Sequence, residues 1–121
     1  MKFKPTADVR HLHPYFWEKV FPLVERFWPV VYPEDADGPL VTSGHETTSK
    51  HGDDSKHYLK NCKSGYCEAA DFRMNDVPNA RAHHFAHGLE TYLLILHNVR
   101  TKIFLEGELT PNAHFHVQLI L

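Results

Sequence analysis

Apolar and aromatic side chains recur at helical spacing in the first quarter of the chain, between residues 14 and 28. This pattern predicts a helix whose apolar stripe packs into a core, and the stripe consists of Phe16, Trp17, Val20, Phe21, Leu23, Val24, Phe27 and Trp28. Pro14 suits a first helical turn, and Pro22 predicts a kink or a division into two short helices. Pro29 predicts the end of the helical segment.

Short apolar runs separated by turn formers predict strands in the middle of the chain. Residues 33–39 are acidic and rich in turn formers, and residues 40–44 then have the pattern of a short buried strand that ends at a glycine. Residues 45–55 are polar and show no periodicity, which predicts a surface loop. Strand character returns in residues 66–73, centred on residues 69–72.

The last third of the chain contains the clearest helical pattern, over residues 80–96. Its apolar face is predicted to consist of Ala82, Phe85, Ala86, Leu89, Tyr92, Leu93 and Leu96. Residues 102–106 and 115–121 then predict the two strands of a hairpin. The order of these elements predicts an α+β fold with a small, mainly antiparallel sheet and flanking helices. Because the pattern contains no repeat or linker, we expect residues 1–121 to form a single domain.

The composition is ordinary for a globular protein except in histidine. Hydrophobic residues make up 42% of the 121 residues, and a net charge of −2 with no basic face gives no reason to expect a nucleic-acid partner. No apolar run approaches the ~18 to 20 residues of a membrane span, so we expect no membrane insertion. The charged residues 1–6 are not followed by the apolar run of a secretory signal, which predicts synthesis in the cytoplasm. The 11 histidines are compatible with metal binding.

Two groups of residues compete as a metal site. The first group is His57, Asp71 and His116, from separate elements around one sheet, and such a set is typical of a zinc site with an open fourth position. The second group is His83 and His87, four residues apart on the predicted helix. This pair lacks the glutamate that follows the first histidine of an H-E-x-x-H motif. We therefore favour the first group and expect the helical pair to face solvent.

Three further features of the sequence bear on the site. The Ser-x-His pattern occurs twice, so His51 is the alternative to His57 as a ligand. The remaining histidines are expected at the surface or in capping roles, and they are His11, His13, His45 and His97. Cys62 and Cys67 are expected as free thiols that help to close one loop, while a local disulfide or a zinc hook would also suit their spacing.

Several short motifs follow one another along the chain, and they are Ser43-Gly44, Ser55-x-His57, Gly65, the run from Glu68 to Phe72, and the run from Ala113 to Val117. Together they resemble the motifs of the D-alanyl-D-alanine carboxypeptidase family of zinc peptidases, over about residues 40–121. That family includes phage endolysin peptidases and the vancomycin-resistance D,D-dipeptidases. It shares its fold with the amino-terminal signalling domain of hedgehog proteins, so the resemblance implies a hedgehog/DD-peptidase-like fold.

The resemblance also implies a role for individual residues. It implies three zinc ligands, which are His57, Asp71 and His116. His114, two residues before the last ligand, would stabilise a developing oxyanion. Glu106, which ends an apolar run, would be the general base, with Glu108 as the reserve candidate.

The chain departs from the family pattern in three places. A longer segment, residues 58–70, separates the first histidine ligand from the aspartate and carries both cysteines. His45 and Glu46 stand in the turn where the family has an arginine that helps to hold the substrate carboxylate. Three basic residues are candidate replacements for it, and they are Lys50, Lys56 and Arg73. The segment 107–113, between the glutamate and the histidines, is longer than usual.

The resemblance implies a zinc-dependent metallopeptidase that hydrolyses a peptide bond in peptidoglycan stem peptides, with a glutamate helping the metal to activate water. The expected cofactor is Zn²⁺, the expected partner is a peptidoglycan peptide, and we expect a monomer. A stand-alone module of this kind is typical of phage-encoded lysins that act on the cell wall after release. The departures keep a second interpretation open, in which the chain is a non-catalytic zinc-binding module on the same fold.

Overall fold

The computed structural model describes residues 1–47, 52–74 and 77–121. These residues form two α-helices and a five-stranded mixed sheet that is mostly antiparallel, which confirms the predicted α+β class. In chain order the elements are β1 (Lys2–Phe3), the π-helical turn η1 (Phe16–Val20), α1 (Phe21–Val31), β2 (Leu40–Ser43), the 3₁₀ turn η2 (Leu59–Asn61), β3 (Ala69–Arg73), α2 (Asn79–His97), β4 (Thr101–Glu106) and β5 (His114–Leu119).

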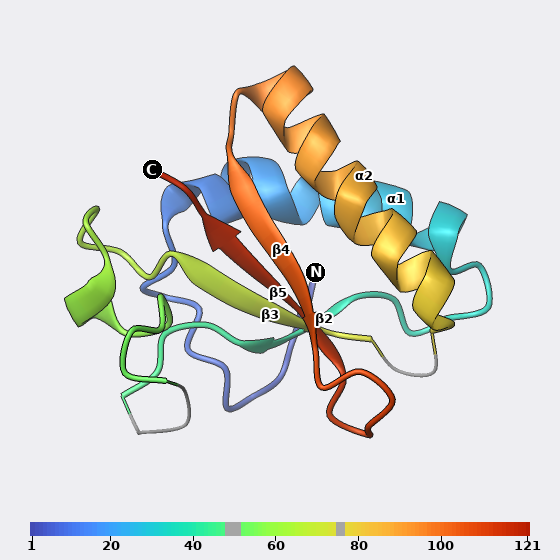
Figure 1. The fold of residues 1–121 in the computed structure, drawn as a ribbon, viewed down its shortest axis with the longest axis horizontal. Helices are drawn as coiled ribbons and strands as arrows, with labels where there is room; N and C mark the ends of the chain where they lie inside the picture. The colour runs from blue at the N-terminus through green and yellow to red at the C-terminus, as the bar shows by residue number, and fades with distance from the viewer. Residues whose placement is uncertain (48–51, 75–76) are drawn as a thin grey trace.

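The strands lie in the order β1-β2-β3-β5-β4, so β5 occupies the interior of the sheet between β3 and β4 (Figure 1). β1 runs parallel to β2, and the other neighbouring strands are antiparallel. Asp71 of β3 lies opposite His116 of β5, and Glu106 of β4 lies opposite His114 of β5. This register brings four of the predicted site residues onto three adjacent strands.

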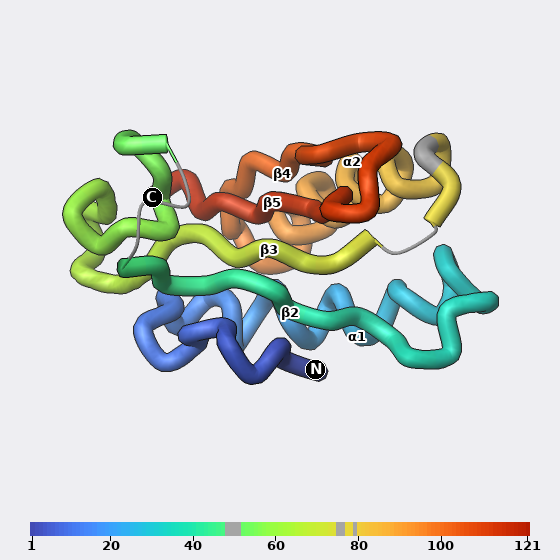
Figure 2. Tube along the Cα trace, turned by 90° about the horizontal axis from the view of Figure 1, so that it is seen from below, coloured from blue at the N-terminus to red at the C-terminus, as the bar shows by residue number. Residues whose placement is uncertain are grey.

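Both helices cover the same face of the sheet (Figure 1). Figure 2 looks at the other face, so the strands lie in front of α1 and α2. Aromatic side chains fill the space between these layers. The ring of Phe115 lies 5.4 Å from Phe85 of α2 and 6.2 Å from Trp28 of α1. The ring of Phe72 lies 5.8 Å from Phe21 of α1. Most of the aromatic stripe predicted from the sequence is therefore core and packs directly on β3 and β5, but Trp17 is 43% exposed, which contradicts the prediction at that position.

The first helix differs from the prediction at one of its prolines. Pro22 lies in the first turn of α1, directly after the π-helical turn η1, so the helical segment changes its hydrogen-bond pattern next to this proline, as the predicted division at Pro22 implies. Pro29 lies inside α1, which ends at Val31, so the prediction that Pro29 ends the helix is wrong. Only one hydrogen bond is lost so close to the end of the helix. The burial of Trp28 and Tyr32, whose N–H bonds the Trp28 carbonyl at 2.7 Å, offsets that loss.

The second helix, α2, follows the predicted apolar face over most of its length. Five of the seven predicted positions are buried, and they are Ala82, Phe85, Ala86, Leu89 and Leu93. Tyr92 and Leu96 are exposed instead, although the Tyr92 ring stacks on Phe27 at 5.0 Å. The helix ends where Asn98 adopts a left-handed conformation with a φ of 52°. Within the described ranges, neither helix combines the length and the apolar character that crossing a membrane requires.

Candidate metal centre

The polar side chains of β3 and β5 lie on the face of the sheet opposite the helices. Successive side chains of a strand point to opposite faces, and Phe72 and Phe115 point into the core. Asp71, His114 and His116 therefore point to the other face. Asp71 and His116 are still buried, because the loop that carries His57 covers them.

Hydrogen bonds fix both the backbone and the ring of His57. Its N–H donates to Ser55 Oγ at 3.1 Å, which gives the serine of the Ser-x-His motif a structural role. Its carbonyl accepts a hydrogen bond from the Glu46 N–H at 3.0 Å. Its ring Nδ1–H donates to the Gly44 carbonyl at 2.6 Å, and the side chain is fully buried. The ring orientation is thus set by the turn that follows β2.

Three ligand atoms converge where His57 meets the sheet. His57 Nε2 lies 3.2 Å from Asp71 Oδ1 and 3.3 Å from His116 Nδ1, and the latter two atoms are 3.0 Å apart. Zinc bonds of about 2.0–2.1 Å in a tetrahedral site keep neighbouring ligand atoms about 3.3 Å apart. His57, Asp71 and His116, called the triad from here on, form a buried group that could hold a metal ion.

The outer hydrogen bonds of the two imidazoles determine which ring nitrogen faces the centre of the triad. The Gly44 carbonyl can only accept, so His57 carries its proton on Nδ1. His116 Nε2 donates to Gln118 Oε1 at 3.2 Å. In their neutral forms both rings therefore direct a lone pair toward Asp71, the arrangement that metal-bound histidines show. Two lone pairs and a carboxylate repel one another at these distances. A proton or a metal ion between them would remove this repulsion.

The charges inside the triad favour an ionised Asp71. Burial alone would raise the pKa of Asp71, but the N–H groups that His116 and His57 present in their protonated forms donate to its carboxylate and hold this pKa well below its usual range. Burial lowers the pKa of His116, and the Asp71 carboxylate beside it more than compensates, so that this pKa is raised. Asp71 is therefore a carboxylate at neutral pH, the form in which it can bind a metal.

Glu106 and His114 border the triad on its more accessible side. Glu106 Oε1 lies 3.4 Å from His116 Nδ1 and 3.7 Å from His114 Nε2. His114 Nε2 also lies 3.7 Å from Asp71 Oδ2, so Asp71, Glu106 and His114 form a further group of potential ligands that shares Asp71. The Glu106 side chain is 51% exposed and that of His114 27% exposed. The structure thus brings together all five residues predicted for the site.

The competing candidates lie elsewhere. His83 and His87 are exposed on α2, as expected for polar-face residues. Glu108, the reserve candidate for the base, has its Oε2 3.5 Å from His83 Nε2 and so contacts this helical pair. His51, the alternative to His57, lies outside the described residues.

The two cysteines are free thiols, in agreement with the default prediction. Both sulfur atoms lie near the Lys56 carbonyl, at 3.2 Å for Cys62 and 3.6 Å for Cys67. Burial raises the pKa of both thiols, that of Cys67 to about 12. They act as packed side chains that hold the loop between His57 and β3 in place.

The turn in which the resemblance expects an arginine is tied back to the sheet. Ser43 Oγ donates to Glu46 Oε1 at 2.6 Å, so the glutamate of this turn bonds the end of β2. Of the three basic candidates, Lys56 donates its ammonium proton to the Asn61 carbonyl within its own loop. Lys50 lies outside the described residues, and Arg73 is exposed.

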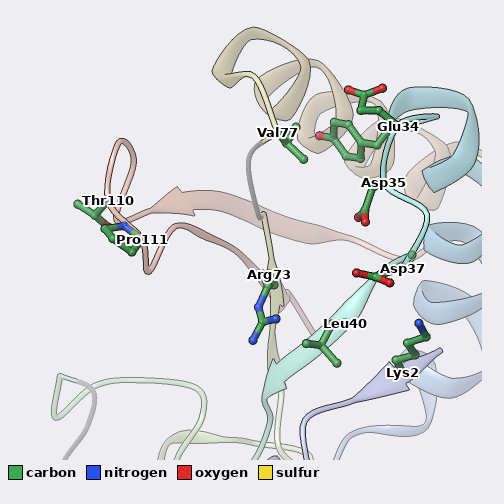
Figure 3. A pocket seen from close by; sticks show the side chains of 11 residues that line it. Lys2, Glu34, Asp35, Asp37, Leu40, Arg73, Val77, Thr110 and Pro111 are labelled. Carbon is green, nitrogen blue, oxygen red and sulfur yellow. The ribbon is translucent and has the colours of Figure 1, made fainter.

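Arg73 lines an open pocket of about 800 Å³ at the end of β3, two residues beyond the aspartate of the triad. Figure 3 shows its guanidinium between the β4–β5 loop, represented by Thr110 and Pro111, and the carboxylates of Asp35 and Asp37. Three acidic side chains, Glu34, Asp35 and Asp37, line the same pocket, and they disfavour an anionic group beside Arg73.

One group of side chains was missed from the sequence. Asp8, His11 and His45 lie together in the structure and form a third group of potential metal ligands. Both histidines were expected in surface or capping roles, and Asp8 was not considered. The only local signal is the spacing of Asp8 and His11, because His45 arrives from the turn after β2.

Comparisons of the chain with family models, with curated proteins and with solved structures find no match. The functional interpretation therefore depends on the residues of the site and their geometry.

Proposed function

We propose that this chain is a zinc-dependent peptidase of the D-alanyl-D-alanine carboxypeptidase type, which hydrolyses a peptide bond in peptidoglycan stem peptides. The approach of Glu106 to the buried triad, with Oε1 3.4 Å from His116 Nδ1, supports this function most directly. A carboxylate beside a two-histidine, one-carboxylate ligand set is the combination that metal-assisted hydrolysis of an amide needs. The mostly antiparallel sheet with both helices on one face is compatible with the fold that the resemblance implies.

The triad would hold the zinc ion. Two neutral imidazoles and one carboxylate leave a net positive charge on the bound ion, and Asp71 provides the single negative ligand. When bound, zinc supplies a Lewis acid for the substrate carbonyl and lowers the pKa of water toward ~7. The hydrogen bonds that the two imidazoles donate to Gly44 and Gln118 keep them in the tautomers that this role requires.

Glu106 would move the proton. Its side chain is half exposed, so it can reach both a water molecule and the amide of a substrate that lies on the open face of the sheet. It would take a proton from the attacking water and deliver it to the leaving nitrogen. The peptide bond would then break to give one carboxylate and one amine.

His114 would assist at the carbonyl oxygen. Its Nδ1–H donates to the Asn112 carbonyl at 2.9 Å, which holds the ring over Asp71 and Glu106. Nε2 faces the accessible side, and in the protonated ring it can donate a hydrogen bond to a developing oxyanion. Arg73, two residues beyond Asp71 on β3, would be the candidate for holding the terminal carboxylate of the stem peptide.

Two variants, Glu106→Gln and its control Glu108→Gln, test this function. Glu106→Gln is expected to lower the release of D-alanine from a stem pentapeptide ending in D-Ala-D-Ala on the order of 100-fold or more, because it removes the base. Its zinc content should stay at the parent level. Glu108→Gln, the matched control two residues away, should keep both properties. Equal rates for the two variants would contradict the role of Glu106.

A non-catalytic zinc-binding module is the second candidate, and the bond from Ser43 to Glu46 favours it. That bond ties down the turn in which a substrate-holding arginine is expected, and a glutamate there repels a carboxylate. Zinc bound by the parent protein without hydrolysis of any peptidoglycan fragment would support this candidate and exclude the peptidase.

A further inference from the structure

A second set of imidazoles lies outside the triad, on the segment before η1 and on the turn after β2. His11 Nδ1 lies 3.2 Å from Asp8 Oδ2, and His45 Nδ1 lies 3.4 Å from the same oxygen. The two imidazole rings meet edge to face with centroids 4.8 Å apart. Asp8, His11 and His45 are called the outer cluster from here on.

The backbone around the outer cluster is held in place without any contribution from the side chains. The Asp8 carbonyl accepts a hydrogen bond from the His45 N–H at 2.8 Å. The His11 carbonyl accepts one from the Cys67 N–H at 2.6 Å, which anchors the other end of the segment next to β3. A Cβ at Gly44 would lie 2.4 Å from the Asp8 carbonyl oxygen, so glycine permits this close approach. The three side chains are therefore gathered by a fixed backbone.

Arg10 orients the Asp8 carboxylate so that Oδ2 faces both histidines. The Arg10 N–H donates to Asp8 Oδ1 at 3.2 Å, and Arg10 Nε lies 3.6 Å from the same atom. His11 Nδ1 lies 3.4 Å from Oδ1 and 3.2 Å from Oδ2, and Oδ2 also faces His45. His45 is 12% exposed and His11 48% exposed, so the cluster is open to the solvent on the side of His11.

We propose that the outer cluster is a second zinc site, with Asp8 Oδ2, His11 Nδ1 and His45 Nδ1 as ligands. All three ligand atoms lie within 4.8 Å of one another, and two of the three separations are near the value of about 3.3 Å for a tetrahedral zinc ion. Imidazole and carboxylate together suit Zn²⁺ better than the oxygen-preferring Mg²⁺ or Ca²⁺. Because His11 is half exposed, this site binds zinc more weakly than the triad.

The outer site is coupled to the triad through a single peptide group. The Gly44–His45 peptide donates its N–H to the Asp8 carbonyl and accepts the ring proton of His57 on its C=O. Zinc on Asp8 and His45 would hold this peptide in the position that orients His57. The outer site therefore serves as a structural clamp, and it does not depend on whether the protein is a peptidase.

Zinc titration of the metal-free protein tests the proposal. The parent is expected to bind two equivalents of Zn²⁺, measured by isothermal titration calorimetry and elemental mass spectrometry. His11→Ala should lose the weaker equivalent and keep the tighter one. His84→Ala, which removes an exposed histidine of α2, should bind two. Two equivalents in His11→Ala, or one in the parent, would overturn the proposal. Because His11 is half exposed, its replacement leaves the fold intact, and circular dichroism verifies this.

A second measurement separates zinc binding from a plain hydrogen-bonded cluster. Without metal, both rings donate Nδ1–H to Asp8, whereas zinc on Nδ1 moves the remaining proton to Nε2. Long-range ¹H–¹⁵N spectra of the imidazoles should show this change of tautomer for His11 and His45 as the second equivalent is added. Retention of the Nδ1–H tautomer at saturating zinc would exclude the site.

Discussion

Asp71 and His116 lie directly opposite each other on β3 and β5, and their Oδ1 and Nδ1 atoms are 3.0 Å apart. The same register directs Phe72 and Phe115 toward the helices. A shift of one residue would turn the ligands into the core and the aromatic rings out of it. The core and the metal ligands are thus specified by one strand pairing, so the geometry of the triad is as well determined as the core itself.

Removing the charge of Asp71 is expected to abolish tight zinc binding. Asp71→Asn keeps the shape of the side chain but replaces the only anionic ligand of the triad with a neutral amide. Zinc affinity at the triad should fall on the order of 100-fold or more, as measured by competition with a chromophoric chelator. Asp53→Asn, at a side chain that is 96% exposed, is the control and should bind zinc like the parent.

The hydrogen bond from His116 to Gln118 predicts opposite results for two substitutions. Gln118→Met removes the acceptor that fixes the tautomer of His116, and zinc affinity should fall about 10- to 100-fold. Gln118→Glu keeps an acceptor and should bind zinc at least as tightly as the parent. A similar loss in both variants would show that Gln118 contributes through packing and has no effect on the tautomer.

Two glycines are expected to respond to alanine with opposite signs. In Gly44→Ala the new Cβ would lie 2.4 Å from the Asp8 carbonyl, so the free energy of unfolding should fall by about 1–3 kcal/mol. In Gly88→Ala, within α2, the new Cβ meets nothing within 4 Å, and the free energy of unfolding should rise by about 0.5–1 kcal/mol. Urea denaturation measures both changes, and a stable Gly44→Ala protein would refute the close approach.

The thiol of Cys67 should be inert in the folded protein. Because burial raises its pKa to about 12, the thiolate fraction at pH 8 is about one part in ten thousand. Iodoacetamide at that pH should label Cys62, which is partly exposed, well before Cys67, and peptide mass spectrometry can follow both. In urea the two should react at similar rates. Equal labelling of the two cysteines in the native protein would mean that the loop between His57 and β3 opens readily.

The parts of the structure that could be predicted are those with a local pattern. Alternation in β5 separates His114 and His116 from Phe115, and the flanking serine marks His57 as an ordered residue. These residues carry part of the family resemblance, and it is the resemblance that implied the triad and the two residues beside it. The end of α1 was mispredicted, because the burial of Trp28 outweighs the local effect of Pro29.

The outer cluster and β1 have no such pattern. β1 contains two residues, too few for a period to show, and its partner β2 lies far along the chain. His45 meets Asp8 only because the segment before η1 crosses the turn after β2. Contacts of this kind depend on the tertiary fold, so His11 and His45, whose spacing indicated no obvious partner, were predicted to have surface or capping roles.

The position of β5 inside the sheet also sets the order of events during synthesis. β4 is synthesised before β5, and β5 is its only neighbour in the described sheet. β3 pairs with β2 on one side and also with β5 on the other. On the ribosome, β4 has no strand to pair with until residues 114–119 have emerged, and the ligand His116 emerges with them. The nascent chain therefore cannot capture a metal ion in the triad early, and loading of the triad coincides with completion of the sheet.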